Sequence, residues 1–342
     1  MDRPNSTERI VLRAYRGPED HPAMNDVANA VRAFNGDPDF GTVADMDNYY
    51  GHLEYADLPR DCALVELDGE VVAYCRASWQ PMADGTRQVD CILNVEPGAR
   101  GIGIEELLLD HALRRAAVHV AKAGPDVATR VLGFATGRDP DQRRRLEARG
   151  FTFTRRYAQL VRPSLDDIPN LPIPRPFEIR PIDPLDVAMH RRIFDAEARG
   201  FADSYGQEAT SEAQWAAFVE APNFDPTLWR VAVDGEAIAG QILNFMDEPR
   251  EDGTRLGMTE AISVQPEYRR RGLARALLAE SLRAVRDAGA TSAGLGVDTQ
   301  NPNEALTLYE DLGFRIVAET FEYELGPSAA GVLPEFGTLW AP

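Results

Sequence analysis

The stretch that decides the fold reads TEAISVQPEYRRRGLARAL and spans residues 259–277. Its first part is rich in residues that favour β-strands, and it stops at Pro266, which has no backbone N–H to donate. Three consecutive arginines follow, and Gly272 then opens a segment in which leucine and alanine recur at helical spacing. The sequence therefore predicts a strand, a short basic turn and a helix.

This basic turn is a candidate anion site. A helix N-terminus presents unpaired N–H groups and a partial positive charge, which together attract phosphate groups. Gly272 and Ala274 are small enough for an anion to approach the backbone around Leu273, and arginines add charge-assisted hydrogen bonds. A run of arginines is also common on a solvated surface, and for the cluster alone this alternative stays open. The candidate binding residues are Arg269, Arg270, Arg271, Gly272, Leu273 and Ala274.

Similar segments occur earlier in the chain. Val95 corresponds to Val264 at an offset of 169 residues, and both lead through a proline to a glycine that opens a helical pattern. Each half also holds an Asp-Gly hairpin signal and ends on Gly-Phe. Tandem copies of one domain explain these matches. The repeated segments are 67–73 with 233–239, 95–103 with 264–272, and 150–151 with 313–314.

A linker over 163–176, which contains five prolines, separates the two copies. We expect a first domain over 1–162, a second over 177–327 and a C-terminal tail over 328–342. Apolar strands at 10–13 and 177–180 would open the two domains. The order of elements in each copy predicts an α/β or α+β domain with a mixed, mostly antiparallel sheet flanked by helices.

Composition excludes several classes of function. With 342 residues the chain is long enough for about two domains, and it has no apolar run of the roughly 20 residues that a membrane helix needs. The net charge of −19 opposes binding to nucleic acids, and a single lysine, Lys122, makes a Walker loop or Schiff-base chemistry improbable. The first residues do not resemble a signal peptide, and three cysteines (Cys62, Cys75 and Cys91) form no disulfide framework. We therefore expect a cytoplasmic protein without a metal site.

The second half resembles the GNAT superfamily of acyl-CoA-dependent N-acetyltransferases. The family signature, Arg/Gln-x-x-Gly-x-Gly/Ala after a Val-x-Pro strand end, corresponds to RRRGLA at 269–274. The later segment VDTQNPNEALTLYEDLGF at 297–314 is similar to a second family motif and follows in the right order. The resemblance covers 177–325 well and the first half weakly. In its architecture the chain is similar to tandem GNAT chains, among which is mycothiol synthase.

The resemblance implies acetyl-CoA as acyl donor and gives several residues a role. Backbone groups of Ile262 and Val264, with Ser263 between them, would bind the pantetheine arm, and an N–H near Val264 would face the oxyanion. Tyr309 would be the general acid that protonates the departing thiolate. Asn301 would help to position the cofactor arm.

The general base is less well defined by the sequence. Glu260 lies on the same face of the predicted strand as Ile262 and Val264, so that its carboxylate could take the amine proton directly or through water. Alternatively, Glu260 only binds a cationic substrate and a water chain removes the proton. Of the five histidines only His190 lies in the second half, outside both motifs, which gives a Ser-His-Asp hydrolase little support.

The first copy lacks residues that the chemistry needs. Glu105 stands where the second copy has Ala274, and Leu146 stands where it has Tyr309. A carboxylate about 5 Å from a diphosphate charge would cost roughly 3 kcal/mol, or about a hundredfold in affinity. We therefore expect the first copy to be a degenerate GNAT domain.

The acceptor is the least determined part of the prediction. Excess acidity favours a primary amine of a small cationic molecule, such as a polyamine, an aminoglycoside or an amino sugar. The competing hypothesis is a non-catalytic acyl-CoA-binding or regulatory protein, against which Tyr309 and Glu260 argue. The acidic residues expected near the site are Asp195, Glu197, Asp203, Asp247, Glu248 and Glu251.

Overall fold

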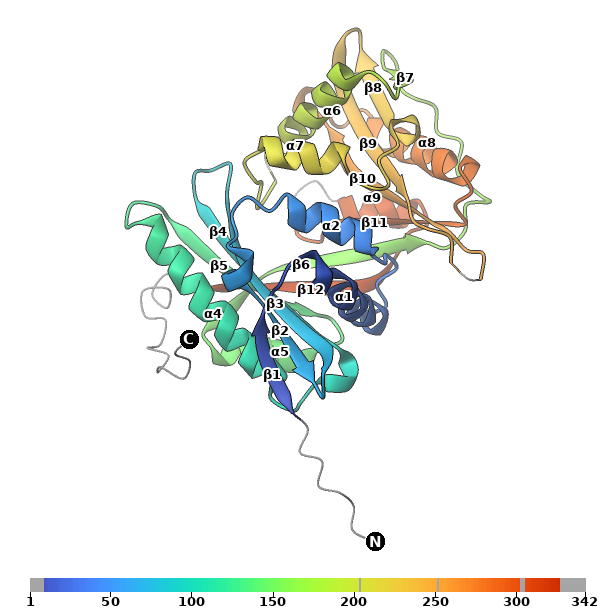
Figure 1. Ribbon diagram of the computed structural model, residues 1–342. Coiled ribbons are helices and arrows are strands. Elements are labelled where there is room, and N and C mark those ends of the chain that lie inside the picture. The colour runs from blue at the N-terminus through green and yellow to red at the C-terminus, as the bar shows by residue number, and fades with distance from the viewer. Residues whose placement is uncertain (1–8, 203, 251, 302–304, 327–342) are drawn as a thin grey trace. The chain divides into compact units, whose positions relative to one another are not determined.

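The computed structural model describes residues 9–202, 204–250, 252–301 and 305–326. The described chain divides into two compact units, each built on a β-sheet with helices packed against it (Figure 1). The first unit combines 9–35, 41–155 and 320–326, and the second combines 36–40 and 156–319. Among the helices of the described residues, none combines the length and the apolar character needed to cross a bilayer.

The sheet of the first unit follows the order β1, β2, β3, β4, β5 and β12. Its neighbouring strands pair antiparallel, apart from the parallel pair β4 and β5. Asp68 and Gly69 form the turn between β2 and β3 with φ angles of 52° and 95°, which are the positive values that a tight hairpin needs. This confirms the hairpin signal. The strands are β1 (Ile10–Ala14), β2 (Cys62–Leu67), β3 (Glu70–Pro81), β4 (Arg87–Val95), β5 (Thr129–Thr136) and β12 (Arg315–Leu325).

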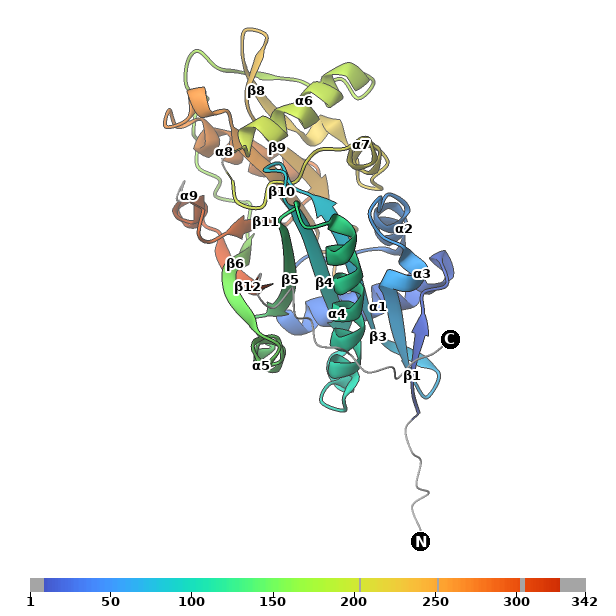
Figure 2. The ribbon, with the colours of Figure 1, turned by 90° about the vertical axis from the view of Figure 1, so that its left-hand side faces the viewer.

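Helices cover both faces of this sheet because its central strands alternate between two apolar clusters. On β3, Cys75 faces the helix α4 while its neighbour Tyr74 faces α1 and α2. Figure 2 shows α4 lying along the strands β3 to β5. The three cysteines are buried thiols. The helices are α1 (His21–Asn35), α2 (Val43–Gly51), α3 (Leu58–Asp61), α4 (Ile104–Ala123) and α5 (Pro140–Ala148), with short 3-10 helices η1 (Pro18–Asp20) and η2 (Pro97–Ala99).

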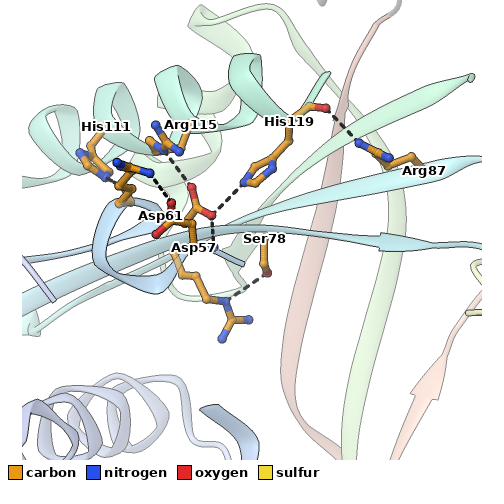
Figure 3. Close-up of polar contacts among 9 residues, drawn as sticks. Asp57, Asp61, Ser78, Arg87, His111, Arg115 and His119 are labelled. Atoms are coloured by element: carbon orange, nitrogen blue, oxygen red, sulfur yellow. Dashed lines mark hydrogen bonds and ion pairs between the residues drawn. The ribbon is translucent and has the colours of Figure 1, made fainter. Parts of the chain in front are cut away.

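A buried carboxylate joins α3 to α4 in the first unit. Asp61 is fully buried, and its carboxylate lies 2.8 Å from Arg115 Nε and 3.1 Å from His119 Nε2 (Figure 3). It also accepts the N–H of Asp57 at 2.6 Å. Burial opposes ionisation of Asp61, but these donors outweigh it and lower its pKa. The network therefore fixes one end of α3 against α4 (Figure 3).

The second unit repeats this plan with the strand order β6, β11, β10, β9, β8 and β7. Its pairs are antiparallel apart from β10 and β11. Helix α8 packs on one face through a leucine-rich cluster, whereas α6 packs on the other (Figure 1). The elements are β6 (Phe151–Arg162), β7 (Glu178–Arg180), α6 (Val187–Gly200), α7 (Glu212–Val219), η3 (Pro226–Leu228), β8 (Arg230–Asp234), β9 (Ala237–Met246), β10 (Leu256–Val264), η4 (Pro266–Tyr268), α8 (Leu273–Asp287), β11 (Ser292–Asp298) and α9 (Ala305–Asp311).

The predicted α+β class with mixed, mostly antiparallel sheets is confirmed, but the compact units differ from the expected boundaries. The division falls within β6, after Arg155, and within β12, after Glu319. The residues of β12 from Thr320 on pair with β5 of the first unit, and those of β6 from Tyr157 on pair with β11 of the second. Strand partners far apart in sequence decide this division, so local composition could not show it.

The proline-rich segment 163–176 belongs to the second unit. Leu165 is buried in the apolar cluster under α8, and three further apolar side chains of the segment pack against the same cluster. The segment is therefore anchored along the second unit. The expected tail over 328–342 lies outside the described residues.

Candidate active site

Strands β10 and β11 separate part of the way along their length. Their parallel pairing covers Leu256–Met258 and Ser292–Gly294, and Thr259 Oγ1 adds a hydrogen bond of 3.1 Å to the Gly294 carbonyl. Beyond this point β10 continues to Val264 along β9. In the described part of the chain, one edge of β10 is thus left open from about Glu260 onwards.

A β-bulge lies at the start of the open edge. Glu260 pairs with Leu243 and Ser263 pairs with Gln241, so two residues of β10 lie opposite a single residue of β9. Ala261, within the bulge, has a φ of 48°, a value that residues with a side chain adopt with some strain. A bulge bends its strand and redirects the groups beside it. The pairing pattern, which the sequence did not reveal, therefore places Glu260 at the mouth of the opening.

The backbone of Val264 faces the open edge. Gln265 donates its backbone N–H to the Ala239 carbonyl at 2.9 Å. The backbone N–H and C=O groups of Gln265 therefore point toward β9, and so do those of Ser263, which lies two residues earlier. The alternation of a strand turns the N–H of Val264 the other way. The role expected for Val264 requires an N–H that points away from β9. Ser263 differs, because its backbone pairs with β9 and its side chain is packed close to Gly200 of α6.

The loop after β10 has the backbone of an anion-binding turn. The short helix η4 leads to Arg270 and Gly272, whose φ angles are 63° and 80°. Gly272 is the N-cap of α8, and no described side chain caps that end. The first bond within α8 joins the Ala276 N–H to the Gly272 carbonyl at 3.2 Å. The N–H groups of Leu273 and Ala274 precede this bond and point out of the helix end.

The three arginines of the loop differ in their surroundings. Arg269 donates through Nε to the Val264 carbonyl at 3.0 Å and through Nη2 to the Gly200 carbonyl at 2.9 Å. The guanidinium of Arg269 thus ties the loop to β10 and α6, whereas the sequence led us to expect a ligand contact. Arg270 and Arg271 are exposed. These two arginines remain as cations beside the helix end.

Tyr309 is buried in the same apolar cluster against which Ile262 and Val264 pack. Burial raises its pKa to about 12, so the phenol keeps its proton at neutral pH. Its ring lies edge-on to Phe314 with the centroids 6.3 Å apart. Asn301 donates its N–H to the Asp298 carbonyl at 3.1 Å in the turn that follows β11. The fold therefore brings the predicted acid close to the predicted cofactor strand.

Two carboxylates share the other side of β10. Burial, followed by the negative charge of Glu260, raises the pKa of Glu197 to about 7. The surrounding protein and then the charge of Asp39 also raise the pKa of Glu260, although part of its side chain reaches solvent. Glu197 was expected only as one of several acidic residues near the site. Its coupling to Glu260 depends on the packing of α6 against β10, for which the sequence gives no signal.

The other acidic candidates are less informative. Asp195 forms an ion pair with Arg191 at 3.0 Å on the surface of α6. Asp247 and Glu248 lie in the connection between β9 and β10. Asp203 and Glu251 lie outside the described residues.

The first unit does not repeat this constellation. Its strand β4 pairs with β3 in a regular register from Val95 to Arg87, without a bulge. Cys91, at the sequence position of Glu260, is buried in the core, and Leu146, at the position of Tyr309, is fully buried. The first unit therefore offers neither a carboxylate nor a phenol at these places.

A model of the acetyltransferase (GNAT) family matches residues 190–314, which include the open strand, the loop and Tyr309. A relative that is 30% identical over 317 residues matches 91% of this chain and 96% of its own length. The chain therefore belongs to the GNAT acetyltransferase family. That relative, from Salinispora arenicola, is named mycothiol acetyltransferase, and this chain is similar to it over nearly its whole length.

Solved structures show the same fold. A GCN5-related N-acetyltransferase from Sphaerobacter thermophilus has a TM-score of 0.69 at 22% identity, covering 92% of this chain and 95% of that one. A tandem GNAT protein from the clavulanic acid biosynthesis pathway has a TM-score of 0.60 at 18% identity, covering 93% and 99% of the two chains. The tandem GNAT architecture expected from the internal repeat is thereby confirmed.

Proposed function

We propose that the second unit transfers the acetyl group of acetyl-CoA to a primary amine of a small molecule, by direct attack within a ternary complex. The observation that carries this proposal is the open edge of β10, which leads directly into the N-terminus of α8, an end that no side chain of the described residues caps. An extended thiol-bearing arm fits such an edge by strand-like pairing, and a diphosphate fits such a helix end.

The residues at the opening fit the donor. The N–H of Val264 would bind the pantetheine arm or the acyl oxygen. The backbone of Ile262, which lies within the bulge, would also bind the arm. The N–H groups of Leu273 and Ala274 would bind the diphosphate. Gly272, at a positive φ that favours glycine, has no Cβ beside them. Arg270 and Arg271 would add positive charge, and Asn301 would flank the arm. When bound, acetyl-CoA supplies an activated acyl group. Arg269 would act indirectly, because its hydrogen bonds to the Val264 and Gly200 carbonyls hold the loop in place.

Each proton of the reaction has a suitable partner. The acceptor is an ammonium ion in solution and must lose a proton before its nitrogen can attack. A carboxyl group with a pKa of about 7 is ionised in a large fraction of molecules at neutral pH, so Glu197 and Glu260 together form the candidate base. As the new C–N bond forms, the C–S bond breaks, and Tyr309 donates its proton to the departing thiolate. The nitrogen of the new amide gives up its second proton, which returns to the Tyr309 phenolate directly or through water.

The paired carboxylates also favour a cationic acceptor. The name of the Salinispora relative makes a mycothiol-related amine the first acceptor to test, before amino sugars, aminoglycosides and polyamines. The assay incubates the protein with acetyl-CoA and each amine and follows free thiol together with the mass of the acetylated product. Thiol release that depends on the amine supports the proposal. Tight binding of CoA without transfer to any amine would instead favour a non-catalytic acyl-CoA-binding protein.

A further inference from the structure

The loops that precede α4 and α8 are structural copies of each other. Each begins with a short 3-10 helix, η2 or η4, and each ends on a glycine N-cap with a φ of 96° or 80°. Arg100 Nε donates to the Val95 carbonyl at 3.2 Å, just as Arg269 Nε donates to the Val264 carbonyl at 3.0 Å. The first unit thus keeps the complete backbone of the anion-binding turn.

One side chain distinguishes the two turns. Glu105, in the first turn of α4, folds back and accepts the N–H of Gly101 at 2.9 Å. The same oxygen lies 3.0 Å from Arg145 Nη2 of α5, and the glutamate is 3% exposed. In the second unit the equivalent position is Ala274, which has no group that could reach the loop. A buried carboxylate and its arginine therefore fill the turn of the first unit.

We propose that the side chain of Glu105 occupies the place of the donor diphosphate in the first unit through its contacts as well as its charge, and so confines acetyl-CoA to the second. That the excluded ligand is acetyl-CoA rests on the proposed function. The sequence suggested only that the charge of Glu105 repels a diphosphate. The contacts add a second effect to this repulsion. The carboxylate already accepts the N–H of Gly101 and pairs with Arg145, so it occupies groups that would otherwise bind the anion. An incoming anion must displace this group as well as overcome its charge.

An ordinary structural ion pair between α4 and α5 is the competing explanation. The neighbouring Glu106 also pairs with Arg145, at 2.8 Å from Nε, but its side chain is about half exposed. In addition, the second carboxylate oxygen of Glu105 is buried without a hydrogen-bond partner among the described residues, which is unfavourable for stability. If holding the helices together were the purpose, Glu106 would serve without this cost. The position of Glu105 is better explained by the turn that it fills.

Calorimetric titration of the full chain with CoA tests the proposal. The wild type is expected to bind one CoA per chain, and Glu105→Ala two, the second site binding at least tenfold more tightly than the wild-type first unit. Glu106→Ala removes an ion pair to the same arginine and leaves the stoichiometry at one. Glu105→Gln keeps the shape and the acceptor oxygen of the side chain without its charge. This variant is therefore also expected to bind one CoA per chain. Thermal melting and the remaining site of the second unit report that each variant is folded.

The outcomes separate this proposal from the proposed function. Two CoA per wild-type chain, or one CoA per Glu105→Ala chain, would overturn the occupation of the turn by Glu105. A second site in Glu105→Gln would show that charge repulsion alone closes the turn, and it would equally overturn the proposal. The double variant Glu105→Ala, Ala274→Glu should retain one site, now in the first unit. If the wild type binds no CoA at all, the donor site of the second unit is wrong, whatever Glu105 does.

Discussion

Replacement of Glu197 by glutamine is expected to make the protein more stable and less active at the same time. Burial and the charge of Glu260 raise the pKa of Glu197 from an ordinary value of 4.5 to about 7. The folded protein therefore holds this proton more tightly than the unfolded chain does, and its stability falls as the pH rises between these two values. Because one pKa unit corresponds to about 1.4 kcal/mol, the wild type loses up to about 3 kcal/mol above pH 7. Glutamine cannot ionise, so Glu197→Gln escapes this loss.

Urea denaturation followed by circular dichroism measures the effect. The free energy of unfolding of Glu197→Gln should equal that of the wild type near pH 4 and exceed it by up to about 3 kcal/mol near pH 8. Glu248→Gln, which changes an exposed carboxylate of the same unit, serves as the matched control and should show no such trend. A difference that does not vary with pH, or a wild type that is the more stable protein near pH 8, would refute the reasoning. If Glu197 is the base, the same variant should also lose the rise of kcat/KM with pH through about 7.

Three further predictions test other parts of the structure. Tyr309→Phe should lower kcat by about 10²- to 10⁴-fold, since the thiolate loses its acid, with the Kd of acetyl-CoA changed less than about twofold in calorimetry; an unchanged kcat removes Tyr309 from the mechanism. Glu260→Gln removes a negative charge that raises the pKa of Glu197, so the acidic limb of the pH–rate profile should move to lower pH, and a limb that stays in place would disprove the coupling. Asp61→Asn should destabilise the protein by about 3 kcal/mol in urea denaturation at neutral pH, because it leaves Arg115 without its buried counter-ion and removes the carboxylate beside His119. Since the pKa of Asp61 is lowered in the folded state, the difference should shrink as the pH falls below its ordinary value of 3.8, and a constant difference would contradict this account.

The sequence by itself determined the local elements and the family. Pro266, Gly272 and the helical spacing after it are properties of a few neighbouring residues, and the structure forms η4 and α8 where the sequence predicted a turn and a helix. The internal repeat gave the tandem plan for the same reason, because it compares residues at a constant offset. The later motif singled out Tyr309, and the structure then shows that this residue is buried in the second unit.

Only the tertiary structure decided how groups distant in the sequence meet. The bulge at Ala261 and the pairing of β10 beyond Met258 depend on which strands lie on either side, and the division of β6 and β12 between the units depends on partners more than a hundred residues away. The high pKa of Glu197 and the inward turn of Glu105 arise from burial beside particular charges. Burial and the distance to other charges depend on residues that are close in space, whereas composition and periodicity describe residues that are close along the chain. A local sequence pattern therefore cannot predict the burial or the charged neighbours of a side chain.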